Sequence, residues 1–236
     1  MSEALAMRAV NAGYGETVVL ENISLTLGQG ESISIIGRNG VGKTTLLSTI
    51  MGHTTLHGGE IRLGDRAIGA WPPYRRALAG IGYVPQERDI FPSLTVKENL
   101  LVGAKPGRWT LDAVCELFAN LKARINNRGN QLSGGEQQML SIARALMTNP
   151  KVLLMDEPSE GLAPVIVEDL VRVMKRLRAD GGFAIILVEQ NIRVALDYSE
   201  RTIVMDRGHV VFDGASKQLQ DDPALLEKLI GVAGND

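Results

Sequence analysis

The 236-residue chain is poor in cysteine and aromatic residues, with the single cysteine Cys115 and only 4% Phe, Trp and Tyr. One cysteine excludes an intramolecular disulfide and any metal cage made only of cysteines, which is typical of a reducing compartment such as the cytoplasm. No stretch approaches the ~20 apolar residues that span a bilayer, and the first residues lack the basic and apolar segments of a secretory signal. We expect a soluble protein, or one held at a membrane by a partner.

Neither sign of charge dominates. The sequence has 25 Lys and Arg against 27 Asp and Glu, a formal net charge of −2. Such a balance disfavours binding to a phosphate backbone by bulk charge, so we expect no nucleic-acid partner. With 44% hydrophobic residues the composition is globular, and a chain of this size buries roughly 70% of its unfolded surface, enough for a core without disulfides or metals.

Short apolar runs bounded by glycine alternate with helical patterns along the chain. The runs predict strands at 5–10, 18–27, 31–36, 60–63, 81–84, 152–155, 184–188, 201–205 and 210–212. Helical patterns cover 43–51, 111–122, 136–147, 165–179 and 223–230, and nearly all of 95–150 is helical. This alternation predicts an α/β fold with a mainly parallel core sheet and a helical insertion.

A glycine-rich loop follows the expected strand at 31–36 and precedes an apolar helical stretch. It fits the pattern Gly, four residues, Gly-Lys-Ser/Thr in its required strand–loop–helix setting. Glycines let the backbone wrap a polyphosphate with N–H groups inward, Lys43 adds a full positive charge, and the Thr44 hydroxyl is a ligand for Mg²⁺. The alternative is an ordinary glycine turn before a helix. The expected phosphate-binding residues are Gly37, Arg38, Asn39, Gly40, Val41, Gly42, Lys43, Thr44 and Thr45.

The loop lacks the features of two other nucleotide-binding classes. After Gly40 and Gly42 comes Lys43, so the third glycine of the dinucleotide fingerprint is missing. An Asn-Lys-x-Asp guanine-reading motif is also missing, which disfavours a GTPase. The phosphate loop alone leaves kinases and motor ATPases open.

A second motif, Asp156-Glu157, ends the apolar run 152–155. Two adjacent carboxylates at the tip of a buried strand are costly unless a cation or hydrogen bonds compensate them. Beside a phosphate loop, Asp156 is suited to hold Mg²⁺ through water, and Glu157 to orient and deprotonate an attacking water. The alternative is a strand end that simply reaches solvent.

A third motif, Leu-Ser-Gly-Gly-Glu at 132–136, opens a helical stretch. Ser133 and Glu136 have the spacing of a capping box, so a plain helix N-terminus is one interpretation. Gly134 and Gly135 each cost up to about 1 kcal/mol relative to Ala in a helix. We therefore expect close approach of a ligand to this backbone, and thus a second anion site.

In order and spacing, these three motifs closely resemble the nucleotide-binding subunits of ATP-binding cassette (ABC) transporters, over essentially the whole chain. Finer segments at 11–15, 137–144, 160–164 and 188–191 are similar to the branched-chain amino acid uptake branch, and to the shorter of its two ATPases. The resemblance implies a P-loop NTPase fold with an antiparallel β subdomain and an inserted helical subdomain. One domain would span 1–236, with the body at about 1–85 and 150–236 and the helical part at about 86–149.

The resemblance also implies roles for individual residues in binding ATP and Mg²⁺. Tyr14 would stack on adenine. The implied metal ligands are Thr44, Gln86 and Asp156, and the implied catalytic residues are Lys43, Glu157 and Gln190. In this family Ser133, Gly134, Gly135 and Glu136 serve the nucleotide held by the other protomer, so ATP becomes part of a dimer interface.

The implied function is Mg²⁺-dependent ATP hydrolysis that energises a membrane importer for branched-chain or related hydrophobic amino acids. The implied partners are multi-span permease subunits, a second ABC ATPase subunit and, indirectly, a periplasmic or extracellular solute-binding protein. Segment 87–95 belongs where family members receive a coupling helix of the permease. Such a subunit lies peripherally on the cytoplasmic face of the cell membrane.

Two positions depart from the commonest family pattern, with Gln190 in place of a switch histidine and Ala163 in place of an Asp. Glutamine can hydrogen-bond a phosphate or water but cannot take a proton. Three alternatives stay open: the same engine for urea, short amides or another small solute, a soluble cassette ATPase of DNA repair or translation, and a binding module without catalysis.

Overall fold

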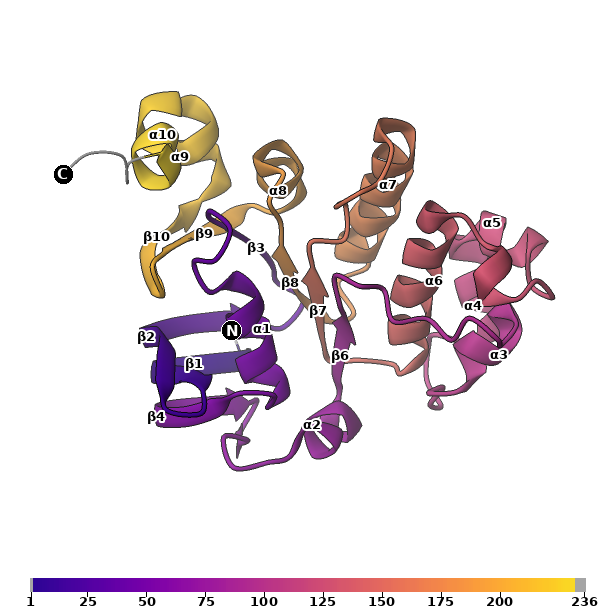
Figure 1. Cartoon of the computed structure of the whole chain (residues 1–236), viewed down its shortest axis with the longest axis horizontal. Helices are drawn as coiled ribbons and strands as arrows, with labels where there is room; N and C mark the ends of the chain where they lie inside the picture. The colour runs from indigo at the N-terminus through magenta and orange to yellow at the C-terminus, as the bar shows by residue number, and fades with distance from the viewer. Residues whose placement is uncertain (1, 232–236) are drawn as a thin grey trace.

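The computed structural model describes residues 2–231, which form two sheets with helices packed around them (Figure 1). The smaller sheet is antiparallel, in the order β2-β1-β4-β5. Its strands are β1 (Glu3–Tyr14), β2 (Thr17–Gly28), β4 (Thr55–Leu63) and β5 (Arg66–Ala67). The expected strands at 5–10, 18–27 and 60–63 all fall inside it.

The larger sheet has six strands in the order β10-β9-β3-β8-β7-β6. All neighbours are parallel except β10 and β9. Its strands are β3 (Ser32–Ile36), β6 (Ile81–Val84), β7 (Val152–Asp156), β8 (Ala184–Val188), β9 (Arg201–Asp206) and β10 (His209–Ala215). The expected α/β fold with a mainly parallel core sheet is confirmed.

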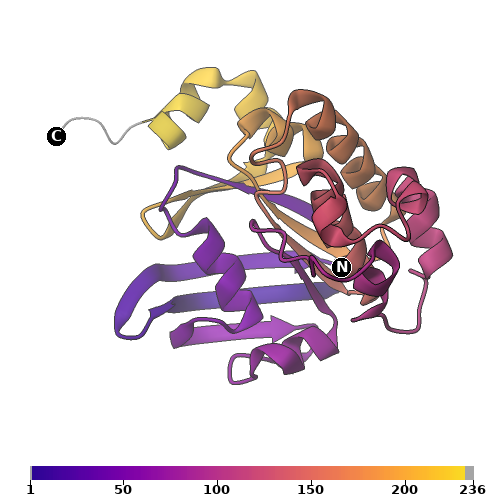
Figure 2. The same ribbon diagram turned by 45° about the vertical axis from the view of Figure 1, so that its right-hand side comes forward.

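The central strands β7 and β8 are buried on both faces, which explains the nearly continuous apolar runs of residues 152–155 and 184–188. Along β7, Val152 and Leu154 enter the core shared with the antiparallel sheet and α1 (Lys43–Met51), whereas Leu153 and Met155 enter the core shared with α6 (Gly134–Met147) and α7 (Pro164–Asp180). Figure 2 shows α1 lying across the antiparallel sheet. Successive side chains of a strand point to opposite faces of the sheet, so β7 contributes to both cores.

The segment between β6 and β7 contains helices joined by loops, the longest of them at 85–95 and 102–110, and lies at one end of the molecule (Figure 1). It contains α3 (Val96–Leu101), α4 (Leu111–Leu117), α5 (Ala119–Ala123), the short 3₁₀ helix η1 (Gly129–Gln131) and α6. The prediction of one helix at 111–122 is wrong, because the backbone leaves the helical region at Phe118 (φ −116°, ψ 72°). The Phe118 ring is 1% exposed in the second core, which the break allows it to reach.

Three shorter helices are not among those predicted. They are α2 (Pro73–Ala79), α8 (Ile192–Tyr198) and α9 (Ser216–Asp221), whereas α3 falls in the stretch 95–150 that was expected to be helical. The expected C-terminal helix is present as α10 (Pro223–Gly231). None of the helices in residues 2–231 has both the length and the hydrophobicity of a membrane span.

Candidate active site

Four loops meet at one edge of the parallel sheet, where β3, β8, β7 and β6 lie side by side and end. The glycine loop follows β3, Gln190 lies just beyond β8, Asp156 ends β7 and Gln86 follows β6. Open α/β sheets bind ligands outside the carboxyl ends of their strands. The sheet order thus brings together residues that are widely separated in the sequence.

The glycine loop turns sharply from β3 into α1. Gly42 has φ +108°, and a Cβ there would lie 2.9 Å from Cδ2 of Leu20 on β2. Only glycine fits both the left-handed backbone and this close packing. The neighbouring residues Arg38, Asn39 and Gly40 are exposed, whereas Gly37, Val41 and Thr45 are buried. The loop is therefore held by its buried residues and accessible to solvent at its exposed ones, as a phosphate-binding loop requires.

Lys43 is only 4% exposed, and its side chain folds back over the loop. Its Nζ donates to the carbonyl oxygens of Gly37 (3.0 Å) and Arg38 (3.1 Å) and lies 3.2 Å from Oε1 of Glu157. The ammonium group therefore joins the glycine loop to the carboxyl end of β7. A phosphate entering the loop would meet this charge at its centre.

Asp156 is fully buried at the end of β7. Burial is the main reason that its pKa rises from 3.8 to about 6, with a smaller contribution from nearby Glu157, while a hydrogen bond from Thr44 opposes the rise. Thr44 Oγ1 lies 3.2 Å from one carboxylate oxygen, and the Tyr83 hydroxyl donates to the other at 3.4 Å.

A hydroxyl and a carboxylate side by side are the oxygen donors that Mg²⁺ takes, usually with phosphate and water completing its shell. A divalent cation here would offset the cost of the buried Asp156 charge. No group of three or more His, Cys, Asp or Glu side chains gathers as a metal site within residues 2–231. The Thr44 and Asp156 pair therefore fits a metal shared with a polyphosphate rather than one held by protein alone.

Glu157 continues β7 beyond Asp156 but turns its backbone into the left-handed region, with φ +44°. Its N–H donates to the Val188 carbonyl at 2.9 Å, which ties it to the end of β8. Left-handed backbone is strained for a residue with a side chain, and such strain persists only where surroundings impose it. The turn aims the Glu157 carboxylate at Lys43 and the glycine loop.

The two expected glutamines lie on opposite sides of this centre. Gln190 is exposed, and its amide donates to Asn39 of the glycine loop. Gln86 is exposed and donates to Glu160, in the loop that follows the acidic pair. Because both amide groups are exposed, each can exchange its present partner for a bound ligand without creating a cavity in the core.

Tyr14 ends β1, and its ring is 51% exposed. The following strand, β2, carries Val19 and Leu20, both close to Gly42 of the glycine loop. The hairpin that presents Tyr14 is therefore attached beside the loop. This placement leaves the ring free to stack on a base.

The Leu-Ser-Gly-Gly-Glu motif begins α6 with the expected capping box. Ser133 Oγ accepts from the Glu136 N–H (3.3 Å), while Glu136 accepts from Ser133 N (2.8 Å) and Oγ (2.9 Å). In the described part of the chain, the side-chain hydrogen bonds and ion pairs of Ser133 and Glu136 join them to each other and to Arg124, not to the glycine loop. One chain thus holds this motif apart from Lys43.

Close approach of a ligand, expected for both glycines of this motif, does not explain Gly135. Gly135 is buried, and a Cβ there would lie only 2.5 Å from Cγ2 of Ile166 on α7. Helix packing within the chain accounts for that glycine. Gly134 is exposed, with the Arg88 guanidinium beside it, and stays open to a ligand.

Two contributors near the site were missed from sequence. Tyr83 donates to Asp156, and Glu189 binds the backbone and hydroxyl of Ser159. The sequence indicates the role of Tyr83 only weakly, through a tyrosine in the expected strand 81–84. The role of Glu189 is indicated more clearly, because a charged residue directly follows the apolar run 184–188.

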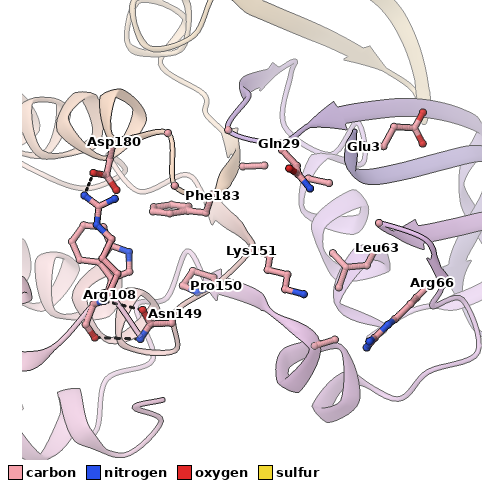
Figure 3. A pocket seen from close by; sticks show the side chains of 18 of the residues that line it. Glu3, Gln29, Leu63, Arg66, Arg108, Asn149, Pro150, Lys151, Asp180 and Phe183 are labelled. Atoms are coloured by element: carbon pink, nitrogen blue, oxygen red, sulfur yellow. Dashed lines mark hydrogen bonds and ion pairs between the residues drawn. The ribbon is translucent and has the colours of Figure 1, made fainter. Parts of the chain in front are cut away.

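A cavity of about 670 Å³ lies away from this centre, at the amino ends of β7 and β8. Figure 3 shows Arg108 and Asn149 on one side and Leu63 and Arg66 on the other, with Lys151 between them. None of the expected site residues lines it. The candidate active site is instead at the carboxyl edge of the sheet.

Comparisons with known proteins agree with this geometry. The family model described as "ABC transporter" matches residues 20–160. The chain is 38% identical to the high-affinity branched-chain amino acid transport ATP-binding protein BraG of Pseudomonas aeruginosa, over 96% of this chain and 99% of BraG. It is 35% identical to the probable branched-chain amino acid transport ATP-binding protein LivF of Archaeoglobus fulgidus, over 94% and 97%.

Lipopolysaccharide export system ATP-binding protein LptB of Escherichia coli is also similar, at 34% identity over 98% of both chains. Among solved structures, the ADP conformation of an ATP-binding cassette of an ABC transporter superimposes with a TM-score of 0.80 at 28% identity, covering 98% of this chain and 100% of the other. The resemblance found in the motifs is confirmed. The chain belongs to the ABC transporter family, as an ATP-hydrolysing subunit with the ABC ATPase fold.

Proposed function

We propose that this ATPase energises a membrane importer for branched-chain or related hydrophobic amino acids. The observation that carries the proposal is the similarity to BraG and LivF over nearly the full length of all three chains. The similar identity to LptB supports a second candidate, an export system for a lipid-linked substrate. The ATPase site itself contacts no transported solute in either case.

At the site, the phosphates of ATP would lie in the glycine loop, with Lys43 on the β and γ phosphates and the Tyr14 ring against adenine. Thr44, Asp156 and Gln86 would hold Mg²⁺, which when bound neutralises phosphate charge. Glu157 would orient the attacking water and take its proton, as a general base within hydrogen-bond reach of the loop. Gln190, released from Asn39, would donate a hydrogen bond to the γ-phosphate or the water.

The separation of the two nucleotide-binding motifs supports a dimeric site. Ser133, Gly134, Gly135 and Glu136 open α6 in the helical segment, whereas Lys43 lies in the body. We infer that the motif of one subunit completes the site of another, either a second copy or a related cassette. ATP would then close the dimer, and hydrolysis would reopen it.

Permease subunits would attach through the segment 87–95, which connects β6 to α3. Phe91 in this segment is 43% exposed, and the Arg144 guanidinium of α6 lies 5.1 Å from its ring centre. An exposed aromatic held in place by its own chain is suited to receive an apolar helix. This attachment would place the subunit on the cytoplasmic face of the membrane.

The test is to isolate the tagged chain from its native membranes in mild detergent and to identify every partner by mass spectrometry. We expect two multi-span permeases, a second cassette and an associated amino acid-binding protein. A urea- or amide-binding protein in its place would keep the importer and change the solute. Lipopolysaccharide export components would replace the importer with the second candidate, and ribosomal or DNA-bound material without permeases would contradict both.

A further inference from the structure

Glu189 is a buried carboxylate between the catalytic loops and has no role in the function proposed above. The residue is 1% exposed and follows β8 directly. Its N–H donates to the Ile35 carbonyl of β3 at 3.1 Å, so the backbone continues the parallel sheet by one residue. The strand carrying the glycine loop therefore fixes the position of Glu189.

Three donors converge on its side chain. Ser159 donates its N–H to Oε1 (3.0 Å) and its hydroxyl to Oε2 (2.8 Å), and the Asn191 N–H donates to Oε2 (3.3 Å). Burial raises the pKa of Glu189, while these hydrogen bonds oppose the rise. In the described part of the chain, no ion pair joins Glu189 to a basic side chain.

The residues it joins flank the catalytic pair. Ser159 lies two positions after Glu157, and Asn191 directly follows Gln190. One carboxylate thus holds the turn beyond the proposed base and the turn beyond the proposed switch residue. Asn191 also caps α8, with its Oδ1 accepting from Val194 N at 3.2 Å, so this second turn continues into a fixed helix.

A purely structural bridge would be redundant at this place. The Glu157 N–H already binds the Val188 carbonyl at 2.9 Å and joins the ends of β7 and β8. What Glu189 adds is the orientation of Ser159 and of the loop at 160–163 that follows it. A buried charge is an expensive means of stabilising a turn, but its multiple acceptor sites fix several donors at once.

We propose that Glu189 is a positioning residue that holds Glu157 and Gln190 in register for hydrolysis. The proposal rests on the catalytic roles given to Glu157 and Gln190. Removing the carboxylate frees both turns, and a displacement of about 1 Å at a reacting centre can lower a rate by as much as ~10²-fold. The backbone and Lys43 of the glycine loop, which would bind the phosphates of ADP, are not hydrogen-bonded to Glu189, so the affinity for ADP should be preserved.

The experiment measures kcat and KM for ATP in the complex, which is isolated through a tag on the full chain. The affinity for ADP and the thermal stability are measured on the purified subunit. We expect E189A to lower kcat roughly tenfold or more, with ADP affinity unchanged within about twofold. E189Q keeps an acceptor for Ser159 and should recover part of the rate. The matched control is T202V, which removes a buried hydroxyl pair to Ser216 (2.7 Å) at a similar depth on β9.

A double-mutant cycle with Q190A, in which kcat is compared among the two single variants and the double variant, separates positioning from general destabilisation. If Glu189 acts through Gln190, the double variant E189A/Q190A should be little slower than the slower single variant. Effects that multiply both in E189A/Q190A and in E189A/E157Q would overturn the proposal. Unchanged kcat in E189A, or a loss matching that of T202V at equal stability, would also overturn it. E157Q in the same series tests the proposed base separately, because turnover in E157Q would refute that role whatever E189A does.

Discussion

Lys43 and Glu157 form a buried ion pair across the candidate active site, with Nζ 3.2 Å from Oε1 and both side chains less than 9% exposed. The lysine comes from the glycine loop and the glutamate from the end of β7. A phosphate bound in the loop would compete with Glu157 for the same ammonium group. Nucleotide binding is thereby linked to release of the carboxylate that we assign as the base.

The first prediction concerns Glu157→Gln. The amide cannot accept the proton of water, so phosphate release should fall by ~10²-fold or more. ATP binding should be kept or become tighter, since the phosphates no longer displace a charged partner from Lys43. A stable dimer should therefore accumulate with MgATP, measured by size-exclusion chromatography with light scattering.

The control is Glu168→Gln, an exposed carboxylate on α7 that lies outside the site. It should hydrolyse ATP at the rate of the unaltered chain and give no trapped dimer. Retained turnover in Glu157→Gln would remove Glu157 as the base.

The second prediction is that Lys43→Ala weakens nucleotide binding itself. Hydrogen bonds to charged groups contribute about 1.5–3 kcal/mol, so the affinity for ADP should fall by roughly 10- to 100-fold. Removal of Lys43 also leaves Glu157 buried without its cation and close to the phosphates. Isothermal titration calorimetry checks this, with exposed Lys175→Ala on α7 as the matched control. Equal affinities in the two variants would contradict the assignment of the glycine loop.

A third prediction is that Asp156→Asn stabilises the nucleotide-free chain. The raised pKa of Asp156, about 6, means that burial of the charged carboxylate opposes folding at neutral pH. The neutral amide avoids this cost, so the free energy of unfolding at pH 7.5 should rise by about 3 kcal/mol. Urea denaturation with a chelator present measures it, and ATP hydrolysis should be lost in the same variant.

The gain from Asp156→Asn should depend on pH. Between about pH 4 and pH 6 the folded chain binds a proton at Asp156 more tightly than the unfolded chain does. The folded chain therefore loses stability as the pH rises through this window, and the variant does not. The difference between the two proteins should shrink toward pH 4, and a constant difference would show that burial of charge is not its cause.

The sequence predicted those parts of the site that local patterns encode. The glycine loop needs its residues in a fixed order between a strand and a helix, and Asp156-Glu157 must end an apolar strand, so both are visible in short windows. The parallel sheet follows from strands that are apolar on both faces, such as β7 and β8. These features depend on neighbours in the chain.

Features that depend on distant contacts were missed. The helix break at Phe118 exists because its ring reaches a core built by α6 and β7, and Gly135 is small because Ile166 packs against it. Propensity within a window carries no information on either contact. The Glu189 bridge to Ser159 likewise joins two loops that only the sheet order brings together.

The last prediction concerns Asn149, between α6 and β7, which fixes the loop before α4 at the cavity of Figure 3. Its side chain accepts from Trp109 N (2.8 Å) and donates to the carbonyls of Lys105 (2.9 Å) and Trp109 (3.3 Å). Its own backbone is left-handed, with φ +50°, which asparagine tolerates better than most residues. Asn149 thus adopts the left-handed backbone of its own turn and supplies hydrogen bonds to the loop before α4.

Asn149→Ala loses the three hydrogen bonds and adds backbone strain, so the free energy of unfolding should fall by about 2–4 kcal/mol. Asn149→Gly loses the same bonds without the strain and should be about 1 kcal/mol more stable than Asn149→Ala. Urea denaturation of both variants separates the two contributions. Because Asn149 lies at the edge of the sheet opposite Lys43, ADP affinity should stay unchanged in both. A loss below about 0.5 kcal/mol in Asn149→Ala would show that the loop before α4 is held without this side chain.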